Sequence, residues 1–176
     1  MPTKPKTRCA ENSLQRSAVF DVTGQYRYQL GRRWQPGEAE VAFIMLNPSR
    51  ADASRDDPTL RACLQFAQHW DYASLSVVNL FSYRNPDPTL LRTAVDPVGP
   101  QNDEYVLKAV VAAQQVVLAW GNWGNLGGRD HTIFALLRPY QSKLYCLQIN
   151  RSGQPRHPLY ISRSRSLMPF HLPSKG

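Results

Sequence analysis

The sequence predicts a single α/β domain, a three-layer α/β/α sandwich with a mainly parallel four-stranded central sheet and an N-terminal β-hairpin at its edge. Four short apolar runs have the length of strands buried on both faces of a sheet. Stretches with helical spacing separate these runs, and this alternation is typical of βαβ units. The length, 176 residues, suits one domain. We expect that domain at residues 18–162, between a flexible lead-in at 1–17 and a basic tail at 163–176.

Two β-prone runs near the N-terminus predict the hairpin. The sequences AVFDV and YRYQL, which begin at residues 18 and 26, flank Thr23 and Gly24. Such a pair of runs around turn residues is typical of two antiparallel strands. We therefore expect the hairpin to form an edge of the sheet.

Four apolar runs predict the parallel strands. The first ends at Asn47 and Pro48, and its lack of polar residues fits a strand that is covered on both faces. The runs are VAFIML, LSVVNL, VVLAW and KLYCLQI, which begin at residues 41, 75, 116 and 143.

A helical pattern follows each of the first three runs. Asp57, followed by Pro58, suits the start of a helix that extends to about Trp70. The next pattern spans residues 102–113, and a third spans residues 131–137 after the glycine-rich segment GNWGNLGG. Helices in these places would cover the sheet.

Composition excludes several classes of protein. The apolar runs are far too short to cross a bilayer. The segment MPTKPKTRCAENS has no apolar core of a secretory signal, so we expect a cytoplasmic protein. Cys9, Cys63 and Cys146 are far apart and form no CxxC pair, so we expect ordinary thiols, no metal site and no cofactor.

The charge distribution favours a polyanionic partner. Lys and Arg total 21 against 13 acidic residues, and no acidic residue follows Asp130. Basic residues accumulate instead toward the C-terminus, among them Arg156, Arg163 and Arg165. Such a surface suits contact with the phosphates of nucleic acid. The alternative is a solubilising, partly disordered terminus.

Polar motifs follow all four predicted strands. The carboxyl ends of parallel strands meet at one edge of a sheet, where ligands bind in open α/β folds. We therefore expect these motifs to share one rim. They are Asn47, Pro48 and Ser49 after the first strand, Asn79 to Arg84 after the second, Trp120 to Gly124 after the third, and Pro155 to Tyr160 after the fourth.

Carboxamide and imidazole groups dominate this rim. An Asn can hydrogen-bond the edge of a nucleobase or hold a water molecule, and a nearby His can stabilise charge on a leaving group. Asn47 before Pro48 could instead form an Asx turn, and His157 could simply be exposed. Asn79 lies within an apolar strand, where a buried amide must find partners. Nucleophile-elbow, zinc-deaminase and P-loop motifs are missing from the sequence.

Other rim residues have two interpretations each. The WGNWG segment could hold a phosphate through its backbone amides or could be a structural turn. Asp52 could supply a base, whereas Asp57 is explained as a helix cap. Phe81 and other aromatic residues could stack on a base, although core packing is the default for aromatic residues beside strand ends.

The motifs MLNPSRAD, DDPT, NLFSYR, the WG of the third strand and GQPRHPLY resemble those of the domain-of-unknown-function family 1643, over residues 18–161. Their order is also similar to that of the uracil-DNA glycosylase superfamily, whose GMNPG or GINPG motif, recognition Asn and HPSP-type loop match MLNPS, VVNLF and RHPLY. The resemblance implies a uracil-DNA glycosylase-like sheet. Leu46, Ser49 and the sequence HPLY depart from these patterns, which leaves the base open.

This second resemblance implies an enzyme that hydrolyses the N-glycosidic bond of an extruded uracil-like or modified base in DNA. Asn47 would position the water and His157 would stabilise the leaving base, with Asp52 as a further catalytic candidate. A non-catalytic nucleic-acid or nucleotide-binding module, or an N-glycosidase of free nucleosides or nucleotides, are the alternatives. We expect a monomer that needs no metal.

The remaining site residues fall into two groups. Base binding is expected from Asn79, Phe81, Pro48 and Ser49. Leu159 or Tyr160 would fill the gap that the extruded base leaves. Contact with nucleic acid is expected from these two and from Arg84, Arg156, Arg163, Arg165, Trp120 and Gly121.

Overall fold

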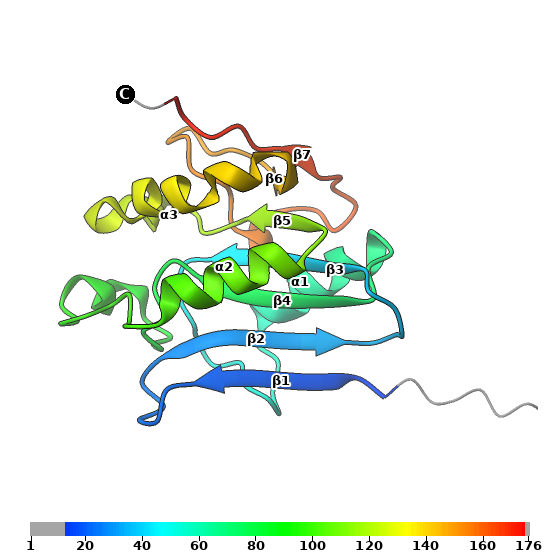
Figure 1. The fold of residues 1–176 in the computed structure, drawn as a ribbon, viewed down its shortest axis with the longest axis horizontal. Coiled ribbons are helices and arrows are strands. Elements are labelled where there is room, and N and C mark those ends of the chain that lie inside the picture. The colour runs from blue at the N-terminus through cyan, green and yellow to red at the C-terminus, as the bar shows by residue number, and fades with distance from the viewer. Residues whose placement is uncertain (1–12, 175–176) are drawn as a thin grey trace, which may run out of the picture.

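A seven-stranded mixed sheet forms the centre of the protein, in a computed structural model that describes residues 13–174 (Figure 1). The strand order is β1-β2-β4-β3-β5-β6-β7, from the bottom of Figure 1 to the top. The strands are β1 Gln15–Phe20, β2 Arg27–Arg33, β3 Glu40–Met45, β4 Ser74–Asn79, β5 Gln115–Leu118, β6 Leu144–Cys146 and β7 Met168–Pro169.

Parallel pairing brings four strand ends to one edge of this sheet. β3 pairs in parallel with β4 and with β5, and β5 pairs in parallel with β6. The register places Met45 opposite Asn79, the last residues of β3 and β4. The loops that follow these strands therefore begin side by side.

Antiparallel strands flank the parallel part on both sides. β1 and β2 form the predicted hairpin, and β2 pairs antiparallel with β4. At the other edge, β7 pairs antiparallel with β6. The mixed α/β character was predicted, whereas the seventh strand was not.

Helices cover both faces of the sheet. The helix α1 (Pro58–His69) lies behind it in Figure 1, and α2 (Asn102–Ala112) and α3 (Arg129–Leu137) lie in front. In α1, the Asp57 side chain accepts a hydrogen bond from the backbone N of Leu60, and Pro58 occupies the first turn, as the sequence predicts. Shorter 3₁₀ segments connect these elements: η1 Pro88–Arg92, η2 Asn122–Gly128, η3 Arg138–Lys143 and η4 Pro158–Tyr160.

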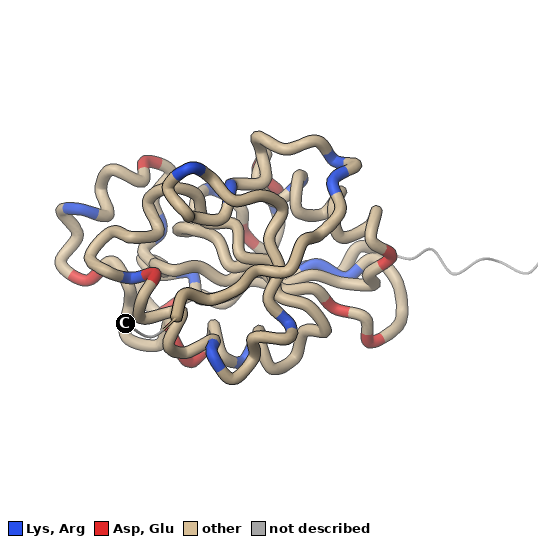
Figure 2. The backbone as a smooth tube through the Cα atoms, turned by 90° about the horizontal axis from the view of Figure 1, so that it is seen from above, with Lys and Arg blue, Asp and Glu red and all other residues tan. Residues whose placement is uncertain are grey.

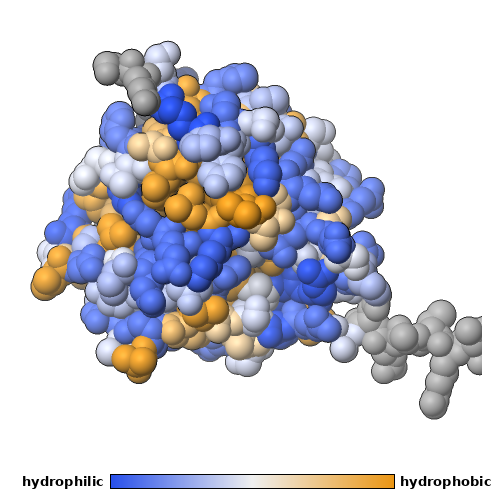
Figure 3. Space-filling view, viewed as in Figure 1, coloured by the Kyte–Doolittle hydropathy of each residue, from blue (hydrophilic) through white to orange (hydrophobic). Residues whose placement is uncertain are grey.

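Two apolar clusters, one on each face, form the core. The cluster beneath α1 includes Phe43, Leu75 and Phe66, and the cluster beneath α2 and α3 includes Ile44, Val110 and Ile133. Adjacent residues of β3 thus point to opposite faces, which explains why the sequence of this strand is apolar throughout. On the outer face of α2 and α3, hydrophilic residues surround a smaller hydrophobic area (Figure 3).

The ends of the chain differ from the expected boundaries. β1 begins at Gln15, inside the segment expected as a flexible lead-in, and residues 1–12 of that segment lie outside the described part. At the other end, β7 joins the sheet and Phe170, which is 3% exposed, packs in the core. The fold therefore reaches into the segment expected as a basic tail. No helix between residues 13 and 174 combines the length and apolarity that a membrane span requires.

The fourth parallel strand is shorter than its apolar sequence suggests. The run KLYCLQI predicts a strand over residues 143–149, but β6 ends at Cys146. Beyond it, an isolated bridge joins Ile149 to Pro155, and the backbone N of Arg156 donates to Gln148 O at 2.8 Å. The chain thus folds back on itself before it reaches His157.

Candidate functional site

A cavity of about 500 Å³ lies at the carboxyl ends of the parallel strands. Its volume is within the range of small-molecule sites. Asn47, Asn79 and His157, from three separate loops or strands, all line it. The structure therefore brings together the three residues on which the sequence analysis centred.

Asn79 is the most deeply buried polar residue of the cavity. It ends β4, its exposed fraction is 1%, and neither its Oδ1 nor its Nδ2 has a hydrogen-bond partner among the described residues. A buried polar group without a partner costs about 1–3 kcal/mol of stability. A ligand that offers one donor and one acceptor would satisfy both atoms of this amide.

Two buried side chains hold the backbone at the end of β4. The Nδ2 of Asn102 donates to Asn79 O at 2.9 Å and to Leu80 O at 3.0 Å. The Nε of Arg129 donates to Leu80 O at 2.7 Å, and its Nη2 pairs with Asp103. Neither residue was predicted as a support of the site, because in the sequence Asn102 is recognisable only as a helix start and Arg129 only as a charge.

Asn47 is fixed by its own amide nitrogen. Its Nδ2 donates to Pro48 O at 3.1 Å and to Asn85 O at 2.9 Å. Within the described chain no group donates to its Oδ1, so the Asx turn considered above is not formed. Because the amide is planar, the two hydrogen bonds set the direction of the free oxygen, which can accept from a water molecule.

His157 precedes the η4 turn and presents one nitrogen to it. Its Nδ1 accepts a hydrogen bond from the backbone N of Leu159 at 3.3 Å. Burial lowers the pKa of His157 below its ordinary value of 6.5, and the Asp57 carboxylate acts in the opposite direction. The imidazole is therefore neutral at pH 7, and the hydrogen bond assigns its proton to Nε2. This N–H can donate to a ligand oxygen.

The carboxylate at the cavity is Asp57, not Asp52. The Oδ1 of Asp52 accepts from Ser54 N, Ser54 Oγ and Arg55 N, each at 2.8 Å. These hydrogen bonds, those from Ser54 first, lower the pKa of Asp52 to about 2, and the residue does not line the cavity. Asp57 lines it while it caps α1.

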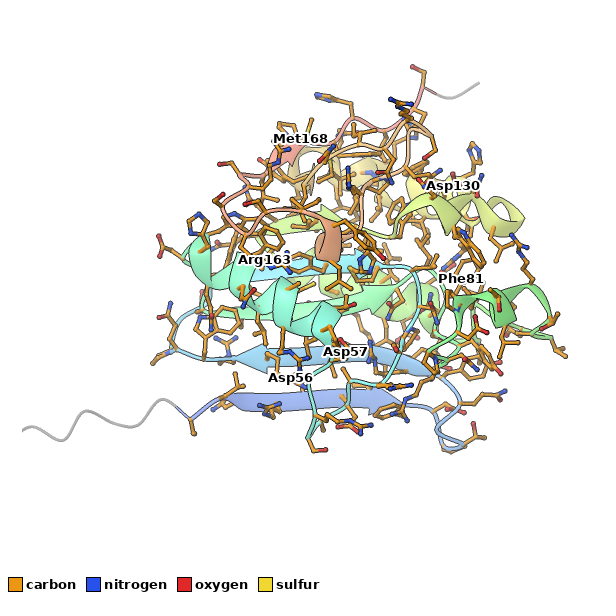
Figure 4. The ribbon with its side chains drawn as sticks, turned by 180° about the vertical axis from the view of Figure 1, so that it is seen from behind. Asp56, Asp57, Phe81, Asp130, Arg163 and Met168 are labelled. Atoms are coloured by element: carbon orange, nitrogen blue, oxygen red, sulfur yellow. The ribbon has the colours of Figure 1, made fainter. Side chains whose placement is uncertain are left out.

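Only one of the other three expected base-binding residues lines the cavity. Ser49 does so. Pro48 is buried beside Asn47, where its carbonyl accepts from Asn85 N at 3.0 Å. Phe81 is 3% exposed, packs in the core beneath α2 and α3, and lines a different cavity (Figure 4). The structure therefore places Phe81 away from the base-binding position expected for it.

Trp120 and Gly121 form part of the wall and its support. The Nε1 of Trp120 donates to Gln154 Oε1 at 2.6 Å, and the Nε2 of Gln154 donates to Asp130 Oδ2 at 2.8 Å. Gly121 has a φ of +78°, which favours glycine, and its N donates to Pro155 O at 2.8 Å. This amide is therefore not free to hold a phosphate. It fastens the glycine-rich segment to the loop of His157.

Several arginines expected to contact nucleic acid hold loops in place. Arg163 donates from Nε to Gln65 Oε1 at 2.9 Å and from Nη1 to Pro158 O at 2.9 Å, and thereby joins α1 to η4 (Figure 4). Arg84 donates from Nε to Ser49 O at 3.3 Å, and the Nη2 of Arg165 lies 3.5 Å from Gln148 Oε1. Arg156 is half-buried. Figure 2 shows Lys and Arg spread around the molecule rather than gathered in one band.

Two exposed apolar side chains lie at the mouth of the cavity. Leu159 and Tyr160 are 37% and 71% exposed, and both line the cavity. The ring of Tyr160 lies 5.8 Å from that of His157. These two side chains are placed to contact a ligand as it enters the cavity.

Arg27, the first residue of β2, lines the cavity and was not expected there. It is 3% exposed, and its Nη1 donates to Ala51 O at 2.7 Å. Burial lowers the pKa of Arg27 to about 10, which leaves the guanidinium charged at pH 7. The sequence offered no signal for it, since a single Arg in a hairpin suggests an exposed position.

The thiols near the site are not reactive. Cys63 lines the cavity, and burial raises the pKa of its thiol well above the usual range. Burial also raises the pKa of Cys146 to about 11. Thiolates are the reactive form, so neither residue is a nucleophile at neutral pH. Cys9 lies outside the described residues.

Comparison with known proteins yields one match. A family model described as "Protein of unknown function (DUF1643)" matches residues 27–159, which include every residue that lines the cavity except Tyr160. No curated protein and no solved structure matches the chain.

Proposed function

The chain belongs to the DUF1643 family, and we propose that its cavity binds an extruded base and hydrolyses the N-glycosidic bond that joins the base to DNA. One observation carries the proposal: the buried amide of Asn79 has no hydrogen-bond partner among residues 13–174, and it lies in a cavity that Asn47 and His157 also line. A carboxamide with both atoms free matches the adjacent donor and acceptor of a pyrimidine edge. The resemblance of the sequence motifs to those of the uracil-DNA glycosylase superfamily supports the same assignment. It also implies that the parallel part of the sheet is similar to the sheet of that superfamily.

The three residues then have distinct roles. The free Oδ1 of Asn47 accepts a hydrogen bond from the attacking water, whose oxygen forms a bond to the anomeric carbon. The bond between that carbon and the base nitrogen breaks, and its electron pair leaves with the base. The Nε2–H of His157 donates to the oxygen of the base on which negative charge develops. The water releases a proton to the solvent and the base anion takes up a proton, so that the products are the free base and an abasic sugar.

The negative charge of the Asp57 carboxylate can stabilise the sugar in the transition state. Positive charge develops on the sugar ring as the glycosidic bond lengthens. A carboxylate that lines the cavity stabilises this charge without forming a bond to it. We assign this role to Asp57 in place of Asp52, because Asp57 lines the cavity and Asp52 does not.

A free nucleoside or nucleotide is the second candidate substrate. The observation that favours it is the scattered distribution of basic residues in Figure 2, together with the use of Arg163 as a loop anchor. Proteins that track a polynucleotide usually present a continuous basic stripe. The same cavity chemistry would then act on a small molecule.

Base release from a defined panel tests the proposal. The purified protein would be incubated with single and double strands that contain uracil, 5-hydroxymethyluracil or other modified pyrimidines, and with the matching nucleosides and nucleotides. Released base would be measured by chromatography, and abasic sites by strand cleavage in alkali. Release is expected from at least one substrate, and Asn47→Ala should abolish it, whereas Asn125→Ala, at an exposed position outside the cavity, should not. No release from any member would refute catalysis.

A further inference from the structure

Arg27 shares the cavity with Asn79 but comes from a different part of the sheet. It begins β2, where its backbone N donates to Ser82 O at 3.0 Å, and the loop after β3 lies over its side chain through the contact with Ala51 O. A guanidinium has five N–H donors. The contact with Ala51 uses one of them, and Nε has no partner among residues 13–174.

A second buried arginine shows how this fold neutralises such a charge. Arg32, on the same strand, is 1% exposed and donates to Asp56 Oδ1 from Nε at 3.0 Å and from Nη2 at 2.9 Å. For Arg27, in contrast, no carboxylate of the described chain lies within 4.0 Å. The two arginines are buried to a similar extent, but only Arg32 pairs with a carboxylate of the described chain.

The surroundings of Arg27 make its lack of a partner costly. The cavity is also lined by the apolar side chains of Leu30, Met45 and Val77. The Asp57 carboxylate opposes the effect of burial on the pKa of Arg27, but it accepts its hydrogen bonds from the backbone of Leu60 and Ala51. Burying a charge in apolar surroundings is unfavourable unless an opposite charge and hydrogen bonds compensate it.

We infer that the ligand of this cavity carries an anionic group, a carboxylate on the base or a phosphate on the attached sugar, and that Arg27 binds this group while Asn79 binds the base edge. The inference rests on the proposed function, because it takes a pyrimidine-like base as the part of the ligand next to Asn79. Carboxylate and phosphate are the groups that a planar guanidinium binds best, through paired N–H donors. A cavity of about 500 Å³ is large enough for a base that carries such a substituent.

Binding of matched acid and neutral ligands tests the inference. Isothermal titration calorimetry would compare 5-carboxyuracil with its neutral amide, 5-carbamoyluracil, and deoxyuridine 5′-monophosphate with deoxyuridine. We expect the acid of at least one pair to bind at least about tenfold more tightly than its neutral counterpart. The first pair reports a carboxylate on the base, and the second reports a phosphate on the sugar.

Two variants of Arg27 and one control assign the preference to this residue. Arg27→Met should abolish the preference, so that the acid and its neutral counterpart bind within about twofold of each other. Arg27→Gln, which keeps a polar end group on a shorter side chain, replaces it if the methionine variant does not fold. Arg61→Met is the matched control, because Arg61 contributes one positive charge from α1 but does not line the cavity. It should keep the preference.

The outcomes separate this inference from the proposed function. Equal affinities within both pairs, no binding by either acid, or a preference that persists without Arg27 would each overturn the inference. If the protein released base from a neutral substrate but bound acid and neutral ligands equally well, the inference would be overturned and the proposed function would stand. Acid-selective binding that depends on Arg27, with no base release from any substrate, would support the inference and refute the glycosylase.

Discussion

Two asparagine–arginine pairs on the two sides of β4 differ in how their polar atoms are used. On the α2 and α3 side, Asn102 and Arg129 donate to the backbone at Asn79 and Leu80. On the cavity side, within the part of the chain that the structure describes, the side chain of Asn79 has no hydrogen-bond partner and that of Arg27 has only Ala51 O. All four residues are at most 5% exposed. Burial alone therefore does not distinguish a structural polar group from one that awaits a ligand, whereas its hydrogen bonds do.

The largest effect on stability is expected from the supporting pair. Arg129→Met removes the hydrogen bond to Leu80 O and the pairing with Asp103, so the free energy of unfolding should fall by about 3 kcal/mol. Urea denaturation followed by circular dichroism would measure it. Arg61→Met, at an exposed helix position, should change the value by less than about 0.5 kcal/mol. An equal loss in Arg129→Met and Arg61→Met would show that the hydrogen bonds of Arg129 do not stabilise the fold more than an exposed arginine does.

The largest effect on function is expected from Asn79. Asn79→Leu keeps the approximate shape of the side chain but removes the donor and the acceptor that meet the base, so the affinity for uracil should fall about 100-fold. Calorimetry would measure the affinity, and the rate of base release should fall in parallel. Unchanged affinity in a folded variant would show that the amide does not contact the ligand.

The same substitution should leave the protein more stable. Because the side chain of Asn79 makes no hydrogen bond with any described residue, replacement by an apolar group of similar size should raise the free energy of unfolding by about 1 kcal/mol. Asn102→Leu is the matched control, since it loses two hydrogen bonds and should lower that energy by about 2 kcal/mol. Thermal and urea unfolding of the two variants would test this, and opposite signs are the expected result.

The smallest effect concerns pH and His157. Burial lowers the pKa of His157 in the folded protein below its ordinary value. As the pH falls, His157 therefore takes up a proton in the unfolded chain before it does so in the folded protein. The contribution of His157 to the free energy of unfolding is therefore fully present above pH 6.5, and it is lost as the pH falls below that value toward the lowered pKa of the folded state. His157→Gln should lose less stability than the natural protein between about pH 7.5 and about pH 5.5. Equal losses would indicate that His157 is not buried in solution.

Local sequence patterns predicted the mixed α/β character of the fold and the meeting of Asn47, Asn79 and His157. These predictions succeeded because strand direction alone brings loop residues to one edge. Phe81 lies away from the cavity, because β4 ends at Asn79 and the chain turns there, so that the alternation of strand faces does not continue. Asn79 and Phe81 consequently lie on different sides of the sheet.

Charged residues were the least predictable part of the site. Arg163 lies in the acid-free part of the chain, which suggested phosphate contact, but it donates to nearby carbonyls that no pattern reveals. Arg27 becomes buried only because a loop 24 residues away folds over it. Such contacts join distant segments, so only the three-dimensional structure shows them.

The last strand has a consequence for how the protein behaves among its own copies. Without β7, the outer edge of β6 would expose unpaired backbone N–H and C=O groups, on which a strand from another molecule could add. A chain cut after residue 162 would lose this cover and the buried ring of Phe170 together. The two residues of β7 thus cover the edge of the sheet and prevent self-association there. They lie in the segment whose composition predicted only a basic tail.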